Sequence, residues 1–150
     1  MTNEKAKGEI IKLLNSALEL EHAARIQYLS HAEIVDGLNA EPIIARLKEI
    51  AKDEEGHEGK FRTLIGDFLG GVPSTGMAKT TPAKTIKEIL EVNLKAEKEA
   101  VDIYKKILEK INASKGELPY EFLKLEHDVR HVIMDEQEHI AELKILLAMR

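Results

Sequence analysis

Two copies of the string Asp-Glu-x-x-His contain the residues of this chain best suited to chemistry. They cover residues 53–57 and 135–139, and upstream of each copy a Glu lies seven residues before a Tyr. The two halves of the chain together supply four carboxylates and two imidazoles: Glu21, Glu54, His57, Glu97, Glu136 and His139. Oxygen and imidazole ligands of this kind suit iron or manganese. The pattern therefore predicts a site for two metal ions.

The spacing within each copy favours metal binding by a helix. Residues three apart on a helix lie on one face, so the Glu and the His of each copy could hold one ion together. Glu21 and Glu97 would complete or bridge the site. A buried carboxylate is costly unless it is paired, and two divalent cations would cancel the charge of four glutamates.

Four further residues are candidates for supporting roles. Ligand histidines usually donate their second N–H to a carboxylate, and we expect Asp53 and Asp135 each to reach the histidine of the opposite half of the chain. Tyr28 and Tyr104 lie two helical turns after the upstream glutamates and are candidate catalytic residues, through hydrogen bonding or electron donation. Ordinary core tyrosines with a satisfied hydroxyl group are an equally good interpretation.

A third Glu-x-x-His pair, Glu19 with His22, is discounted, because Glu19 lies about 200° around a helix from Glu21 and is expected to face solvent. Other residues are assigned to surfaces or interfaces: His31, His127, His131 and Glu58.

Apolar residues recur at helical spacing in four long segments, and in each of them Glu, or Glu with His, interrupts the apolar stripe near its middle. The predicted helices cover about residues 4–36, 42–69, 82–113 and 119–149. Pro42 falls in the first turn of the second helix, and Thr81 with Pro82 predicts the start of the third. The chain is therefore expected to be all-α.

The connections between these segments predict how the helices are arranged. Short links near residues 37–41 and 114–118 favour two antiparallel helical hairpins. The link at residues 70–81 is rich in Gly, Ser, Thr and Pro. Twelve extended residues span about 40 Å, close to the length of a 28-residue helix. A long crossover loop joining two hairpins into a four-helix bundle is expected.

The composition narrows the class of protein. A chain of 150 residues with 43% hydrophobic and 33% charged residues predicts one globular domain, residues 1–150. The absence of cysteine excludes disulfides, thiolate metal sites and iron–sulfur clusters. A net charge of −5 argues against a nucleic-acid partner. No apolar run approaches the ~20 residues of a membrane span, and the N-terminus does not resemble a signal peptide, so a cytoplasmic location is expected.

Three stretches resemble known proteins. Residues 21–28 and 50–57 are similar to the first and second helix motifs of rubrerythrins, and residues 68–73 are similar to the crossover of bacterioferritins. The resemblance covers nearly the whole chain and points to the ferritin-like superfamily of di-iron carboxylate proteins. It implies a ferritin-like bundle that binds two iron ions through the six residues named above, with manganese as an alternative.

This chain departs from the two families at several positions, and these departures change the expected chemistry, cofactor and oligomer. Rubrerythrins have a second glutamate where this chain has Ala100, which argues against their peroxidase chemistry. Bacterioferritins bind haem through a methionine where this chain has Glu55, so haem is not expected. The 11 residues after His139 (150 − 139) leave no room for the fifth helix of 24-subunit cages, which favours a homodimer or a smaller homo-oligomeric shell. Without a rubredoxin domain, an external electron donor is expected.

Three functions are compatible with these patterns. The first is a di-iron oxidoreductase that oxidises Fe(II), or reduces hydrogen peroxide or O2. The second is iron storage in a ferritin-like shell. The third is a structural bundle that metals only stabilise. The patterns do not distinguish iron from manganese or O2 from peroxide, and they leave open the oligomer size, the electron donor and a possible organic substrate.

Overall fold

The computed structural model describes residues 2–149, and the long elements of this part of the chain are four helices. They are α1 (Asn3–Ala32), α2 (Ala40–Thr63), α3 (Ile86–Ala113) and α4 (Phe122–Met149). A π-helical turn, Leu64–Phe68, extends α2, and a short 3-10 turn, Lys115–Glu117, precedes α4. The predicted all-α fold is confirmed.

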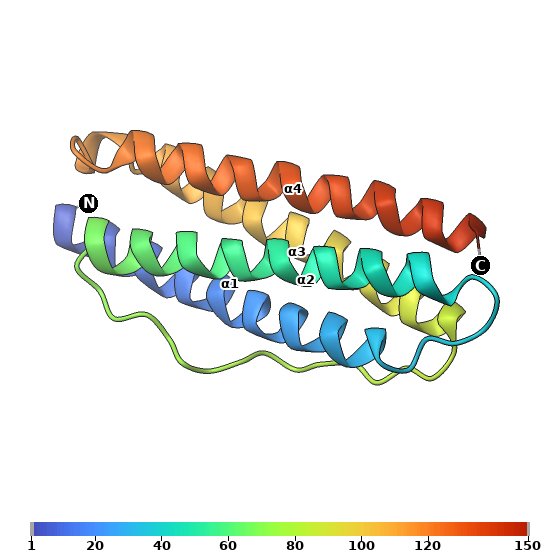
Figure 1. Ribbon diagram of the computed structural model, residues 1–150. Helices are drawn as coiled ribbons and strands as arrows, with labels where there is room; N and C mark the ends of the chain where they lie inside the picture. Colours follow the sequence, from blue (N-terminus) through green and yellow to red (C-terminus); the bar gives the residue numbers. More distant parts are fainter. Residues whose placement is uncertain (1, 150) are drawn as a thin grey trace.

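The helices form two antiparallel hairpins, α1 with α2 and α3 with α4, which lie side by side (Figure 1). The segment between α2 and α3 runs along the outside of α1 from one end of the bundle to the other (Figure 1). Side chains of α1 hold this segment: Asn15 Nδ2 donates to Val72 O at 3.1 Å, and Gln27 Oε1 accepts from Thr81 N at 2.6 Å. The predicted bundle with one long crossover is therefore confirmed.

The predicted start of the third helix at Thr81 and Pro82 is wrong. The helix begins at Ile86, and Thr85 is its N-cap, with its hydroxyl oxygen accepting from Glu88 N at 3.1 Å. The Thr85 hydroxyl also donates to the Glu88 carboxylate at 3.0 Å. Thr81 cannot open the helix because its backbone is bonded to side chains of α1. An N-cap threonine is thus present, four residues later than the pattern indicated.

The other predicted helix ends shift by a few residues. The first helix ends at Ala32 rather than 36, ahead of a turn in which Gly37 adopts φ +99°, a conformation that favours glycine. The second begins at Ala40 rather than 42, and its last turn is π-helical and ends at Phe68 rather than 69. The fourth begins at Phe122 rather than 119, after the 3-10 turn.

The apolar core consists of two clusters with a polar layer between them. One cluster fills the end of the bundle that includes Leu14, Phe61 and Val129, and the other fills the end that includes Leu47 and Leu143. The six candidate ligands fall between these clusters on all four helices. The polar layer is therefore enclosed between two apolar clusters. No helix within residues 2–149 is long and apolar enough to cross a membrane.

Candidate metal centre

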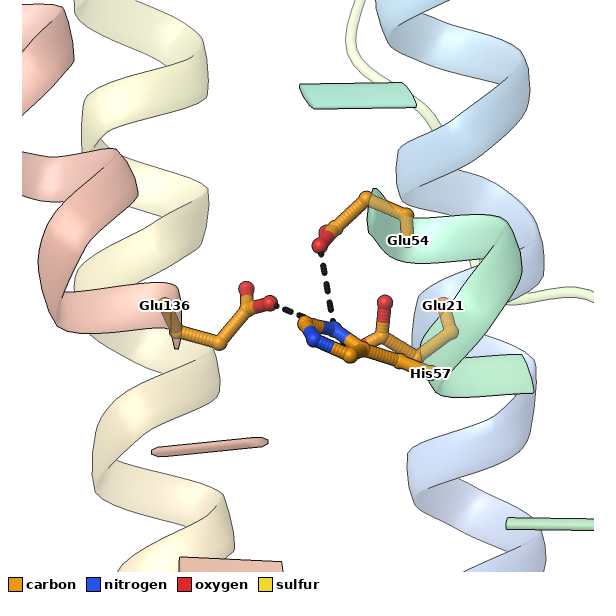
Figure 2. A group of neighbouring side chains, drawn as sticks. All are labelled: Glu21, Glu54, His57 and Glu136. Carbon is orange, nitrogen blue, oxygen red and sulfur yellow. Dashed lines mark ion pairs between the residues drawn. The ribbon is translucent and has the colours of Figure 1, made fainter. Parts of the chain in front are cut away.

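The six predicted ligands come together in the middle of the bundle. Each helix of one pair, α1 and α3, contributes one glutamate, and each of α2 and α4 contributes a Glu and the His three residues later. All six are buried, with 1–2% of their surface exposed: Glu21, Glu54, His57, Glu97, Glu136 and His139. Figure 2 shows four of these side chains, from α1, α2 and α4, pointing toward one another. Helical i, i+3 spacing accounts for the pairs on α2 and α4.

The ligand atoms fall into two overlapping groups, within each of which they lie no more than 4.8 Å apart. The first group is Glu21, Glu54, His57 and Glu136, and the second is Glu54, Glu97, Glu136 and His139. Glu54 and Glu136 belong to both groups. Glu21 and Glu97 belong to one group each, an arrangement that favours the expectation that they complete the site over the expectation that they bridge it.

The site fits metal ions because each of the six residues has one buried polar atom without a hydrogen-bond partner outside the centre; within the centre, His57 Nδ1 and Glu136 Oε1 lie 2.9 Å apart as an ion pair. These atoms are Glu21 Oε2, Glu54 Oε1, His57 Nδ1, Glu97 Oε2, Glu136 Oε1 and His139 Nδ1. Buried polar atoms nearly always have hydrogen-bond partners, so six such atoms gathered at one place point to a missing ligand. Two divalent cations would satisfy all of them and balance four carboxylates. The role of these residues as metal ligands stays a prediction.

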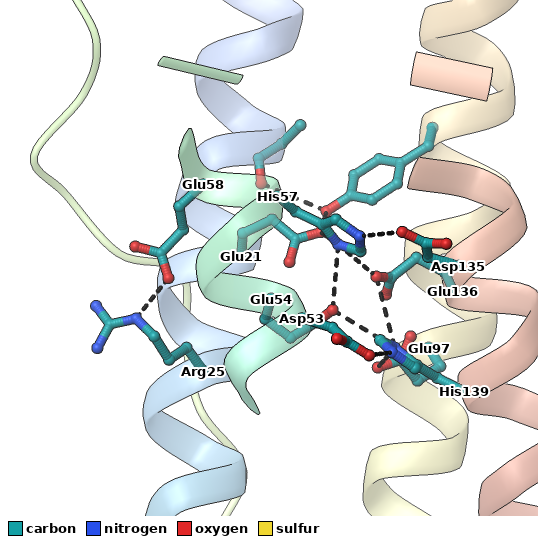
Figure 3. Close-up of polar contacts among 12 residues, drawn as sticks. Glu21, Arg25, Asp53, Glu54, His57, Glu58, Glu97, Asp135, Glu136 and His139 are labelled. Atoms are coloured by element: carbon teal, nitrogen blue, oxygen red, sulfur yellow. Dashed lines mark hydrogen bonds and ion pairs between the residues drawn. The ribbon is translucent and has the colours of Figure 1, made fainter. Parts of the chain in front are cut away.

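Carboxylates support the two histidines from the opposite hairpin. His57 Nε2 lies 2.9 Å from Asp135 Oδ2, and His139 Nε2 lies 2.9 Å from Asp53 Oδ2 (Figure 3). Because an ionised carboxylate can only accept, Nε2 donates to the aspartate, and Nδ1 is the nitrogen that would bind a metal ion once its own proton is displaced. The expected crossing of each Asp to the other hairpin is present.

The two tyrosines also cross between the hairpins. Tyr28 Oη donates to Glu97 Oε1 at 2.8 Å, and Tyr104 Oη donates to Glu21 Oε1 at 2.9 Å. Each tyrosine therefore orients the terminal glutamate of the other half of the chain, while the second oxygen of that glutamate stays unpartnered. Their catalytic role remains a prediction.

Burial and mutual repulsion shape the proton affinities of the metal-free centre. Burial, followed by the charges of Glu21 and Glu97, raises the pKa of Glu54 well above its usual value. Burial and the charge of Glu21 do the same for the pKa of Glu136. Burial alone would lower the pKa of His57, but hydrogen bonds to Glu136 and Glu21 outweigh it and raise the pKa to about 11. Without metal, the centre therefore retains protons that cations would displace.

Replacement of Asp135 by Asn is expected to weaken metal binding about 10–100-fold, because the neutral amide no longer raises the basicity of His57. The fold should persist, since the Asp135 side chain is 44% exposed. Competition with a chromogenic chelator measures the change. Asp102→Asn, an exposed aspartate on α3, is the matched control, and equal affinities in the two variants would contradict the supporting role of Asp135.

Tyr28→Phe and Tyr104→Phe are each expected to destabilise the metal-free protein by about 1–3 kcal/mol, because a buried glutamate oxygen loses its donor. Urea unfolding curves measure this change. Tyr120→Phe is the control, since Tyr120 is 92% exposed. Unaltered stability in both core variants would show that the two hydroxyl groups do not hold the glutamates.

Sequence reasoning misplaced three polar residues. Glu58 is not on the solvated face: it is 3% exposed and accepts from Arg25 Nε at 2.5 Å (Figure 3). His31 is not at the surface but 5% exposed, and its Nε2 lies 3.1 Å from Thr81 O. Glu19 does not face open solvent but accepts from Ser74 Oγ of the crossover at 2.5 Å.

One signal could have revealed the burial of His31. Asn93 sits on the apolar stripe of the third helix, and its side-chain amide donates to His31 Nδ1 at 3.0 Å. Gln27 Nε2 in turn donates to Asn93 Oδ1 at 2.9 Å. An amide on an apolar stripe predicts a buried polar partner.

A cavity of about 140 Å³ adjoins the centre between α1, α3 and the crossover. Both tyrosines line it, as do Glu54, Glu97 and Ala100. Ala100 is the position at which rubrerythrins have a second glutamate. The cavity exceeds the ~30 Å³ that one water molecule occupies in the liquid. A small molecule could therefore lie next to the ligands.

The family described as a ferritin-like domain matches residues 11–149 of this chain. The bacterioferritin of Desulfovibrio desulfuricans is 28% identical over 138 residues, which cover 91% of this chain and 73% of that protein. The crystal structure of the Desulfovibrio desulfuricans bacterioferritin, which describes its diiron site in different catalytic states, superposes on this chain with a TM-score of 0.87 at 24% identity, over 99% of this chain and 83% of that one.

Two further solved structures share the fold. A ferritin-like, diiron-carboxylate protein from Bacillus anthracis superposes with a TM-score of 0.86 and 28% identity, over 95% of this chain and 97% of that chain. A dodecameric thioferritin from Bacteroides fragilis, described as related to bacterioferritin, superposes with a TM-score of 0.82 and 23% identity, over 95% of this chain and 86% of that chain.

Proposed function

Because the chain belongs to the ferritin-like domain family, we propose that it binds two iron ions and oxidises Fe(II) with O2 or hydrogen peroxide. The observation that carries this proposal is the set of six buried ligand atoms that lie in two overlapping groups and have no hydrogen-bond partner outside the centre. A pair of bound Fe(II) ions would supply two electrons to an oxidant. Manganese, which accepts the same ligands, is the alternative metal.

The residues of the chain would bind the two ions, orient the histidine ligands and exclude water from the site. Glu54 and Glu136, which belong to both groups of ligand atoms, would help to hold both ions. Asp53 and Asp135 hold the histidine rings so that Nδ1 faces the centre. The apolar clusters above and below keep bulk water away, and the adjoining cavity offers a small oxidant a place next to the ligands.

Iron storage is the second candidate, and the similarity to a bacterioferritin favours it. Storage needs a closed shell, and a dodecamer is known for one structural neighbour. We propose a homo-oligomer for this chain, with an external electron donor if the iron turns over. A bundle that metal only stabilises is the third candidate, and it predicts binding without oxidation.

Anaerobic loading with Fe(II), followed by stopped-flow mixing with O2 and with H2O2 in parallel, tests the proposal. Two ions per chain oxidised much faster by H2O2 would support peroxide consumption. Fast oxidation by O2, uptake beyond two ions per chain and the native mass of a shell would support storage. Binding without accelerated oxidation by either oxidant would overturn the proposal and leave the structural role.

A further inference from the structure

We propose that His127 and His131 on α4 form a second metal site, separate from the buried centre, that binds one divalent transition-metal ion at the surface. The two histidines are four residues apart on one helix face, and their ring centroids lie 4.1 Å apart with a tilt of 31°. Two helical histidines at this spacing can chelate one ion. The His127 side chain is 55% exposed, so an ion can reach it from solvent.

The ring of His127 is oriented for binding by a buried carboxylate. His127 Nδ1 lies 3.0 Å from Asp128 Oδ1, so Nδ1 donates and Nε2 keeps its lone pair. Asp128 is 5% exposed, and Lys124 Nζ lies 3.3 Å from its other oxygen. This is the same pairing of imidazole with carboxylate that supports His57 and His139 in the buried centre.

His131 is free to act as the second ligand. Its ring packs against that of His127, and within the part of the chain that the structure describes neither of its nitrogens has a hydrogen bond or an ion pair. The nearby charges of Glu126 and Arg130 are already paired with each other, at 2.7 Å. The exposed Nε2 of His127 and the unused nitrogens of His131 thus remain as ligands, with water completing the shell.

Two imidazoles select the class of metal. Such ligands suit Ni(II), Cu(II), Zn(II) and Fe(II), in contrast to Mg(II) or Ca(II), which prefer oxygen. The next residue in the same register is Asp135, the partner of His57, about 6 Å further along α4. The surface site therefore lies on the helix face that leads to the buried centre.

Calorimetric titration of the full chain with Ni(II) tests the site through a difference in stoichiometry. His131→Gln is expected to bind one ion per chain fewer than the wild type, and His127→Gln the same. Glu138→Gln, an exposed residue of the same helix, is the control and should bind as many ions as the wild type. Asp128→Asn should keep the site but weaken it roughly 10-fold.

If His131→Gln bound as many Ni(II) ions per chain as the wild type, the proposal would be overturned. Occupation of the surface site by Mg(II) would overturn it as well. Circular dichroism of each variant serves as the control that the helices persist. Because the readout is a difference of one ion, it does not depend on whether the buried centre binds iron or oxidises it. Failure of the surface site and failure of the proposed function are therefore distinguishable.

Discussion

Replacing Glu54 and Glu136 together by alanine is expected to abolish stoichiometric binding of iron to the buried centre. Both residues belong to both groups of ligand atoms, so their loss leaves each group with only one carboxylate and one imidazole. The loss of affinity should exceed the about 100-fold that removal of a supporting residue costs. Anaerobic titration with Fe(II), followed by removal of unbound metal and iron analysis, measures the effect.

A second variant separates loss of ligands from loss of fold. Glu54→Gln with Glu136→Gln preserves side-chain volume and removes both negative charges, so it should keep its helices and still fail to bind iron. The matched control is Glu55→Ala with Glu138→Ala, two exposed glutamates in the same motifs. Unchanged iron binding in the Glu54 and Glu136 variants would refute the assignment of the centre.

Loading the centre with metal is expected to raise the melting temperature by about 10–20 °C near neutral pH. Free metal at about 100 times its dissociation constant adds about 2.7 kcal/mol per site. For a domain of this size each kcal/mol raises the melting temperature by roughly 2–4 °C. Thermal unfolding monitored by circular dichroism, under anaerobic Fe(II) or with Mn(II), measures the shift.

The stability of the metal-free protein should depend on pH in a direction set by the same residues. The pKa values of Glu54 and Glu136 are raised by burial and repulsion, and that of His57 is raised to about 11. A group with a raised folded-state pKa stabilises fully below its unfolded pKa and loses that contribution as the pH rises through its folded pKa. The metal-free protein should therefore lose stability as the pH rises above the ordinary glutamate pKa of 4.5, and the loss should continue toward about pH 11, the folded-state pKa of His57.

Comparison with a centre that lacks two of its four carboxylates tests that sign. The metal-free Glu54→Gln, Glu136→Gln variant lacks the two titrating carboxylates, so its melting temperature should fall less over the same pH range. The gain from metal should grow with pH in the wild type, because fewer protons then compete for the ligands. A metal-free wild type that gains stability relative to the variant as the pH rises would contradict this account.

Much of the fold could be predicted because its causes are local. The apolar stripes of four helices follow from residues three and four apart, and short links impose antiparallel hairpins. The length and composition of residues 70–81 predict a crossover. The candidate ligands were also predictable, because i, i+3 spacing places Glu54 beside His57 whatever surrounds them.

The exact ends of the helices were less predictable, because tertiary contacts compete with local signals. Thr81 followed by Pro82 has the features of a helix start, as Thr85 has. The hydrogen bonds that join Thr81 N to Gln27 Oε1 and Thr81 O to His31 Nε2 hold Thr81 in the crossover, so the helix begins at Ile86 with Thr85 as its N-cap. In the sequence Glu58 resembles a solvated residue. In the fold it is buried, because Arg25 of the neighbouring helix pairs with its carboxylate.

The contacts between hairpins were decided by the tertiary structure alone. That Glu54 and Glu136 occupy the shared positions, and that Tyr28 reaches Glu97, depends on the rotation and axial offset of one hairpin against the other. These quantities arise from packing of side chains far apart in the chain, so no local pattern contains them. The sequence by itself thus determined which residues could bind metal, and the packing of the two hairpins decided how those residues meet.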